Sequence, residues 1–274
     1  MWFDAGVSDA KLPTALTAPR TRALALCGGL VLALFGVAAF APLPFTLTRP
    51  GVTADTLGTY NGAPVITITG APTRTTSGQL RATTISATNA GEEISFRTAV
   101  VAWVRGDEAV LPSDAVYPQD DPGDAEQETA HQMTESQDSA TAAALSYLHL
   151  SPSQVTVKID LGDIGGPSAG QMLSLGIIDK LNGNGHGGDL TGGRIIAGTG
   201  TIDERGVIGA VGGIPLKTRA AARDGATVFL VPKSECSDAK VDTPDGLRLV
   251  PVTTLASAVA ALDALDKGGA VPSC

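Results

Sequence analysis

An uncharged, mostly apolar run separates Arg22 from Arg49. A helix that crosses a bilayer needs about 20 mostly apolar residues, and the run supplies that length before its first proline would break a helix. We therefore predict a transmembrane anchor at residues 23–45. A cleaved signal peptide is the alternative, because Ala39-Phe40-Ala41 has the small-x-small form of a cleavage site, although the run is longer than most signal-peptide cores.

Basic residues favour one orientation of this anchor. Lys11, Arg20 and Arg22 precede the run, whereas only Arg49 follows it closely. Because positively charged flanks stay on the cytoplasmic side of a membrane, we expect residues 1–22 in the cytoplasm. The rest of the chain, after the anchor, is then expected outside the cytoplasm as part of a single-pass membrane protein.

The pattern downstream of the anchor predicts a β-rich segment followed by an α/β domain. Within residues 46–150, strand-like stretches lead to an acidic loop and to a helix that Asp124 would cap. Within residues 151–274, strand and helix patterns alternate. The expected strands are 65–69, 80–88, 94–104, 155–161, 194–202, 207–211, 227–231 and 247–250, and the expected helices are 124–148, 167–181, 214–224 and 253–265.

Composition and charge narrow the classes of function. Of the 274 residues, 43% are hydrophobic and 17% are charged, which is enough apolar material for the core of one or two domains. The formal net charge is −9, with a pI near 4.7. Phosphate backbones are bound by basic clusters, so we expect no nucleic-acid partner. No cysteine has C-x-x-C spacing, and we expect neither a metal nor a cofactor.

Two of the three cysteines lie in the part of the chain expected outside the cytoplasm. They are Cys236 and Cys274, whereas Cys27 lies in the apolar run. In an oxidising compartment such thiols tend to pair, and a bond between them would stabilise the fold by roughly 2 to 4 kcal/mol. We therefore predict a disulfide between Cys236 and Cys274, with two free thiols as the alternative.

A glycine-rich motif between a predicted strand and a predicted helix has the setting of a nucleophile. Pro167 suits the first position of a helix, so Ser168 falls in the first turn, where unpaired backbone N–H groups can stabilise an oxyanion. Its small neighbours Gly166 and Ala169 let a substrate backbone approach, and with Pro167 they form the predicted substrate loop. The alternative is that Ser168 only caps the helix.

A serine nucleophile needs a base, and the histidines are poorly placed for that role. The Gly-x-Ser-x-Gly spacing around Ser168 matches the nucleophile elbow of α/β-hydrolases, in which an acid and then a histidine follow the serine. Only His186 follows Ser168, close in sequence and within a glycine-rich loop, while His131 and His149 precede it. A classical esterase is therefore the alternative in which His186 would be essential.

Lys217 is the stronger candidate for the base. A lysine can accept a proton at neutral pH if its pKa falls from about 10.4 to about 7 or 8. Lys217 follows Gly212-Gly213-Ile214-Pro215-Leu216 at the start of a predicted helix. There the positive end of the helix dipole and the apolar neighbours both disfavour an ammonium group. An exposed helix lysine is the alternative.

Three motifs together resemble the Lon proteolytic domain in order and spacing, over about 110 residues from 155 to 265. The resemblance implies an α/β (α+β) Lon-type fold and a Ser-Lys dyad of Ser168 and Lys217, with Thr199 at the position that hydrogen-bonds the lysine. It also implies assembly into rings. The motifs are Gly-Pro-Ser-Ala-Gly around Ser168, Ala197-Gly198-Thr199-Gly200-Thr201-Ile202, and Gly206-x-Ile208-x-x-Val211-Gly212-Gly213-Ile214-x-x-Lys217.

The whole chain is more similar to the membrane-anchored Lon-like peptidases that carry no ATPase. Those relatives usually insert a PDZ module after the helix that ends near Leu148, whereas here only about six residues join Leu148 to Val155. The acidic residue that ATP-dependent Lon proteases place three before the serine is replaced by Gly165. No phosphate-binding loop is recognisable, so we expect no use of ATP.

The sequence thus predicts an ATP-independent serine endopeptidase, anchored in the cell membrane, that cleaves proteins or peptides outside the cytoplasm. Ser168 would attack the scissile carbonyl, Lys217 would take its proton, and Thr199 would orient Lys217. A catalytically silent Lon-fold assembly or adaptor protein of the cell envelope is the alternative. Self-association into a homo-oligomer is also expected from the resemblance.

Overall fold

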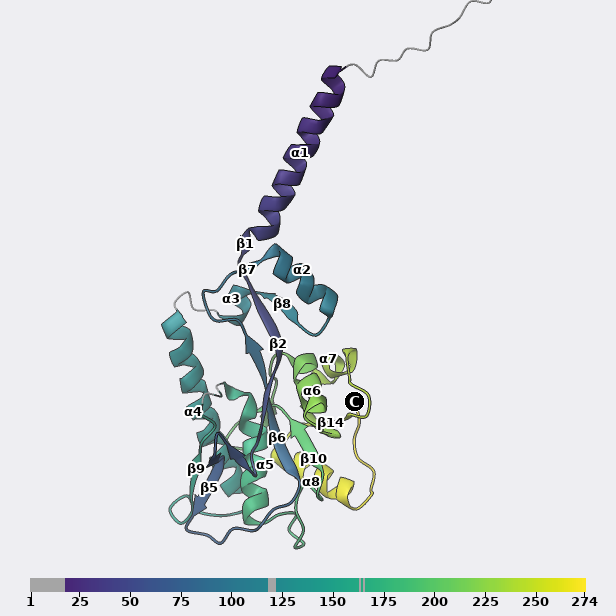
Figure 1. The fold of residues 1–274 in the computed structure, drawn as a ribbon. Coiled ribbons are helices and arrows are strands. Elements are labelled where there is room, and N and C mark those ends of the chain that lie inside the picture. The colour runs from purple at the N-terminus through teal and green to yellow at the C-terminus, as the bar shows by residue number, and fades with distance from the viewer. Residues whose placement is uncertain (1–17, 118–121, 163, 165) are drawn as a thin grey trace, which may run out of the picture.

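A computed structural model describes residues 18–117, 122–162, 164 and 166–274 (Figure 1). Its first element is helix α1 (Ala18–Phe40), which stands clear of the folded part of the chain. The apolar stretch Arg20–Phe40 is 21 residues long, and none of its most hydrophobic window is buried against protein. A helix of that length and composition can span a bilayer, and the sequence prediction of an N-terminal membrane helix is supported to that extent.

A six-stranded sheet forms the centre of the fold, with the strand order β14-β13-β10-β6-β2-β8. The four strands from β14 to β6 run parallel to one another, and β2 and β8 are antiparallel to their neighbours. The strands are β2 (Phe45–Asp55), β6 (Gln79–Ala87), β8 (Ala109–Pro112), β10 (Ile195–Gly198), β13 (Val228–Pro232) and β14 (Arg248–Val252).

Helices cover both faces of this sheet, because its parallel strands are apolar on both sides. Along β13, Val228 and Leu230 enter one hydrophobic core, and Phe229 and Val231 enter the other. Helices α4 (Pro122–Tyr147), α5 (Gly170–Leu181) and α8 (Leu255–Asp266) pack into the first core, and α6 (Ile214–Arg223) and α7 (Cys236–Val241) into the second. The predicted mixed α/β class is confirmed.

Shorter elements complete the chain. The paired strands are β1 (Pro42–Leu43) with β7 (Ile94–Ser95), β3 (Thr59–Tyr60) with β4 (Ala63–Pro64), β5 (Ile66–Thr69) with β9 (Thr156–Ile159), and β11 (Thr201–Ile202) with β12 (Ile208–Gly209). The remaining helices are α2 (Phe96–Arg105), α3 (Ser113–Val116), and the 3₁₀ turns η1 (Pro167–Ala169) and η2 (Lys233–Glu235).

The predicted strand at 94–104 is wrong. Only Ile94 and Ser95 are extended, and the chain then forms helix α2. The Ser95 side chain accepts a hydrogen bond from the backbone N–H of Thr98, which caps the start of the helix, and Gly106 ends it in the left-handed conformation with a φ of 72°. These two caps outweigh the strand preference of the β-branched residues between them.

The β-rich part of residues 46–150 shares its sheet with the rest of the chain. Strand β6 lies beside β10 in parallel register, with Gly198 opposite Ala82. The Thr83 hydroxyl, which is buried, donates a hydrogen bond of 3.1 Å to the carbonyl of Gly198. Helix α4 begins at Pro122, so Asp124 lies in its first turn instead of capping it. The two predicted ranges therefore contribute to one common core.

Candidate active site

Ser168 lies in a tight turn directly before helix α5. Gly166 precedes that turn with a φ of 92°, a conformation that favours glycine, and Pro167 opens the 3₁₀ turn η1. Helix α5 then starts at Gly170, and Ser168 is half-buried. The predicted helix start at Pro167 is confirmed as a 3₁₀ turn that continues into an α-helix. Gly165 lies outside the residues that the structure describes.

The turn of Ser168 is fastened to the end of strand β10. The backbone N–H of Gly200 donates to the carbonyl oxygen of Ser168 at 3.0 Å, and the Thr199 hydroxyl donates to the same oxygen at 3.2 Å. Gly200 has a φ of 155°, which larger residues rarely adopt, and a Cβ atom there would lie 2.6 Å from the Gln171 side-chain oxygen and 2.9 Å from Ile208, so another residue would be strained. The structure thus joins Ser168 and Thr199, two of the three predicted catalytic residues.

Lys217 lies in the first turns of helix α6 and is only 3% exposed. Gly213, with a φ of 73°, turns the chain into the helix, and the Lys217 backbone N–H donates to its carbonyl at 3.1 Å. Burial of the ammonium group lowers the pKa of Lys217 to about 8, against a smaller opposing effect from the negative charge of Glu235. A pKa near 8 is in the range of a general base at neutral pH.

Ser168 and Lys217 come from opposite faces of the sheet. Helix α5, which follows Ser168, packs into the core that contains Leu230, whereas α6 packs into the core that contains Phe229. Elements on opposite faces of a sheet can meet only at an end of the strands, and ligand sites in α/β sheets form at the carboxyl ends. Thr199 follows the carboxyl end of β10, and η2 follows that of the adjacent parallel strand β13.

Among the described residues, no hydrogen bond joins the two members of the predicted dyad. The Lys217 amine and the Ser168 hydroxyl make none there, and the Thr199 hydroxyl donates to the Ser168 carbonyl instead of orienting the lysine. In enzymes without substrate, catalytic hydrogen bonds are often long and tighten only in the complex. The Ser-Lys dyad, and the role of Thr199 toward the lysine, therefore stay predictions.

Glu235 is a buried acid near Lys217 that sequence reasoning missed. It ends the turn η2, is 9% exposed, and its Oε2 accepts a hydrogen bond of 3.0 Å from the backbone N–H of Val211. Burial raises the pKa of Glu235, and the nearby positive charge of Lys217 counteracts that rise. Val211 precedes the glycines that lead into α6, so Glu235 holds the backbone on which Lys217 is mounted.

Two depressions lie close to the predicted catalytic elements. A cavity of about 500 Å³ is bordered by the loop and first turn that precede Lys217, through Gly213 and Leu216, and on the opposite side by Leu111 and Val116. A smaller one of about 180 Å³ lies beside Pro167. The described residues that line these two cavities include neither Ser168 nor Lys217.

The histidines lie on the surface. His186 is exposed in the glycine-rich loop, and His149 is exposed beyond the end of α4 with a φ of 56°. His131 is also exposed, 3.7 Å from the carboxylate of Glu135 on the same helix. In the described part of the chain, no three side chains of His, Cys, Asp and Glu gather as a metal site would.

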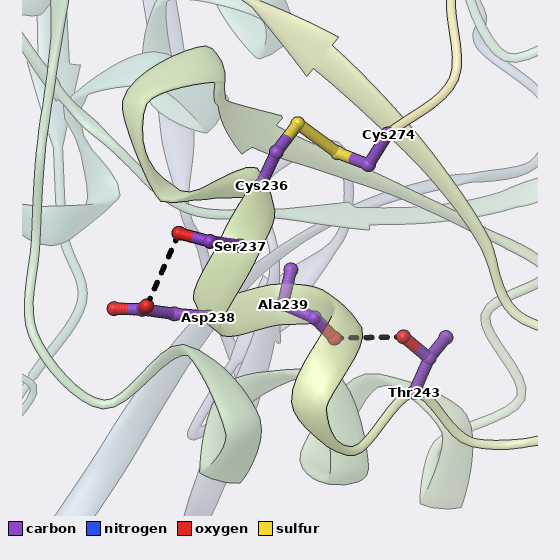
Figure 2. The surroundings of a disulfide bond; sticks show 6 residues. All are labelled: Cys236, Ser237, Asp238, Ala239, Thr243 and Cys274. Atoms are coloured by element: carbon purple, nitrogen blue, oxygen red, sulfur yellow. Dashed lines mark hydrogen bonds between the residues drawn. A yellow bond between two sulfur atoms is a disulfide. The ribbon is translucent and has the colours of Figure 1, made fainter.

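A disulfide joins Cys236 to Cys274 and confirms that prediction (Figure 2). The bond ties the C-terminal tail to the first residue of α7, and Cys236 directly follows Glu235. The tail thus closes over the second core, where both cysteines pack at the edge. The third cysteine, Cys27, is free and exposed on α1. No model of a known protein family matches the chain.

Proposed function

We propose that the protein is a membrane-anchored, ATP-independent serine endopeptidase of the Lon-like type, with Ser168 as nucleophile and Lys217 as base. The observation that carries this proposal is Lys217 itself, which is 3% exposed and has a pKa lowered to about 8 by burial. Burial of an ammonium group without an ion pair is costly, and strongly perturbed groups concentrate at functional sites.

The turn of Ser168 supports the same chemistry. Because the Ser168 carbonyl is fixed by Thr199 and Gly200, the peptide units of the turn are held in place while the hydroxyl stays free of hydrogen bonds to described residues. The backbone N–H groups at the start of a helix are suited to hold an oxyanion. Gly166 and Ala169 carry little or no side chain beside the serine, which leaves room for a substrate backbone.

The proposed reaction has two steps, acylation and deacylation of Ser168. Neutral Lys217 Nζ takes the proton of Ser168 Oγ while that oxygen bonds to the scissile carbonyl carbon, and the resulting oxyanion is held by backbone N–H groups of the turn. Collapse of this intermediate breaks the C–N bond, and Lys217 returns its proton to the leaving amine. Water then attacks the acyl-enzyme with Lys217 again as base, which releases the acid and restores Ser168.

The proposed location is the outer side of the cell membrane. Helix α1 is long and apolar enough to span a bilayer, and the basic residues ahead of it favour a cytoplasmic N-terminus. A disulfide in the domain that follows suits an oxidising compartment. The substrate is proposed to be protein or peptide, and a homo-oligomer is proposed from the Lon resemblance.

The test is a cleavage assay with the full chain in detergent, using a fluorescein-labelled unfolded protein and no added ATP. The wild type is expected to release labelled peptides, and Ser168→Ala to lower kcat/KM by at least about 10³-fold, as removal of a serine nucleophile does elsewhere. The exposed Ser153 provides the control, because Ser153→Ala should keep full activity. A wild type without turnover would instead favour the silent adaptor.

Glu235→Gln is expected to shift the pH dependence of that cleavage toward acid. The charge of Glu235 raises the pKa of Lys217, and the glutamine keeps a hydrogen-bond acceptor for Val211 while it removes the charge. The pKa of Lys217 should fall, so the rise of kcat/KM with pH should occur at a lower pH than in the wild type.

The measurement is a pH profile of kcat/KM for both proteins. Asp238→Asn serves as the control, since Asp238 is an exposed carboxylate on the neighbouring turn of helix. Its profile should stay close to that of the wild type. If the profile of Glu235→Gln shifts toward alkaline pH or does not move, the charge of Glu235 does not raise the pKa of the catalytic base.

A further inference from the structure

Helix α2 presents an apolar face that the folded chain does not cover. Four large side chains recur at the i, i+4, i+7 and i+8 positions of one helix face. Their exposed fractions are 51% for Phe96, 39% for Val100, 82% for Trp103 and 77% for Val104. Ala102, on the opposite side of the helix, is fully buried. The small residue Ala102 therefore faces the domain, and the four large apolar residues face outward.

This helix lies at the base of the membrane helix. Helix α1 ends at Phe40, and the next strand, β1, pairs with β7, so that Pro42 lies opposite Ser95. Ser95 is also the residue that caps α2. The start of α2 is thus fixed by backbone pairing two residues beyond the end of α1, and α2 lies beside the end of α1 that joins the folded part of the chain (Figure 1).

The composition of α2 fits the boundary between lipid and water. Tryptophan is enriched at this boundary, where its ring contacts acyl chains and its N–H stays near the headgroups. Two exposed arginines, Arg97 and Arg105, accompany the apolar residues. Long basic side chains reach from such a helix to lipid phosphates. If this face contacted water alone, Trp103 and Val104 would have no such favourable contacts.

We propose that α2 is an interfacial helix, which lies in the surface of the same bilayer that α1 spans, with Phe96, Val100, Trp103 and Val104 inserted among the lipids. The occupant of this face is a lipid surface because the face begins where the span ends. The proposal rests on α1 crossing the membrane and is independent of peptidase activity.

Seating α2 in the bilayer also fixes the position of the predicted active site. The Arg219 side chain donates a hydrogen bond to the carbonyl of Gly106, the residue that ends α2, and forms an ion pair with Asp242. Arg219 belongs to α6, two residues beyond Lys217. Helix α6 is therefore linked to the interfacial helix. In the proposed peptidase this link would hold Lys217 close to the membrane, a consequence that rests on the proposed function.

The sequence supplies a probe for the test. The chain has two tryptophans, Trp2 and Trp103, so Trp2→Phe leaves Trp103 as the single emitter. The full chain with this change is placed in vesicles of phosphatidylcholine and phosphatidylglycerol, with or without bromine on the acyl chains. We expect brominated lipid to quench most of the Trp103 emission, and aqueous iodide to quench little of it.

A reporter far from the membrane calibrates both quenchers. Tyr147 lies at the end of α4 away from α1 and is 37% exposed, so a chain with Trp2→Phe, Trp103→Phe and Tyr147→Trp should respond to iodide and not to brominated lipid. Iodide quenching of Trp103 as strong as that of the reporter would overturn the proposal. Shielding of Trp103 from both quenchers would also overturn it, because protein would then cover the face.

A charge placed in the face gives an independent measurement. Val104→Asp, in the Trp2→Phe chain, is expected to lift the helix from the lipid and to increase the iodide quenching of Trp103. Val241→Asp is the control, since Val241 is equally exposed at 79% but lies on α7. It should leave the quenching of Trp103 unchanged. Equal quenching in the Val104→Asp chain and its parent would contradict insertion of this face.

Discussion

Replacing Lys217 by methionine is expected to abolish cleavage and, at the same time, to make the protein more stable at neutral pH. Methionine has nearly the length of lysine without its charge, so it fills the buried site without the cost of an ammonium group. The loss of the base should lower kcat by about 10³-fold or more. A protein that is inactive and yet more stable cannot owe its inactivity to misfolding.

The stability part follows from the lowered pKa. Folding lowers the pKa of Lys217 from 10.5 to about 8, so between these values the unfolded chain binds more protons than the folded one. The free energy of unfolding of the wild type should therefore rise with pH from about 8 to about 10.5. Below pH 8 the folded state bears the full cost of the buried ammonium group. At pH 7, Lys217→Met should gain about 1–3 kcal/mol, since each pKa unit corresponds to about 1.4 kcal/mol.

Kinetics of the single and double variants provide the decisive comparison. If Ser168 and Lys217 act as one unit, Ser168→Ala, Lys217→Met and the double variant should share the same residual rate. Lys180→Met is the matched control, because Lys180 is a partly buried lysine that donates to the carbonyl of Leu57, away from the serine. A Ser-Lys dyad would be contradicted if the double variant lost activity by the product of the two single losses, or if Lys217→Met kept its activity.

The surroundings of Ser168 and Lys217 were predictable because local chemistry dictates them. Pro167 directly follows Gly166, and Pro215 lies two residues after Gly213. Both prolines occupy early helix positions, where their fixed φ and missing N–H are tolerated. The helices that start there carry continuous apolar faces. Sequence alone therefore placed Ser168 in the first turn of one predicted helix and Lys217 at the start of the next.

Helix α2 was missed because two signals conflict within it. Its valines favour a strand, whereas the spacing of Phe96, Val100 and Trp103 is helical and Ser95 can cap a helix. The predicted strand at 94–104 rests on the first signal alone. The outward direction of the apolar face was also hidden, because a pattern of large apolar residues usually marks the side that packs on the protein.

Long-range pairing accounts for what the sequence could not indicate. Strand β6 joins β10 although Thr83 and Gly198 lie 115 positions apart, and no local pattern specifies such a neighbour. Glu235 stands among polar residues in a loop and looks solvent-exposed. Its burial comes from the packing of η2 against Val211, 24 positions earlier. The electrostatic environment of Lys217 is therefore a tertiary property.

Removing the Cys236–Cys274 bond is expected to destabilise the protein by about 2–4 kcal/mol without changing the arrangement of the sheet. The two cysteines are 38 positions apart, and a loop of that size loses roughly 4 kcal/mol of chain entropy when it is closed in the unfolded state. Cys236→Ser with Cys274→Ser should lower the urea midpoint, and the wild type under a thiol reductant should show the same midpoint.

A further variant separates the effect of the bond from that of the thiol side chains. Cys27→Ser keeps the bond, so it should unfold like the wild type and respond fully to reductant, whereas the double serine variant should not respond at all. Because Cys236 follows Glu235 and starts α7, release of the tail should also loosen the turn that holds Val211. The reduced protein should then lose protection of the Val211 amide against hydrogen exchange, while the amides of β13 stay protected. Equal midpoints before and after reduction would show that the bond contributes nothing to the stability of the fold.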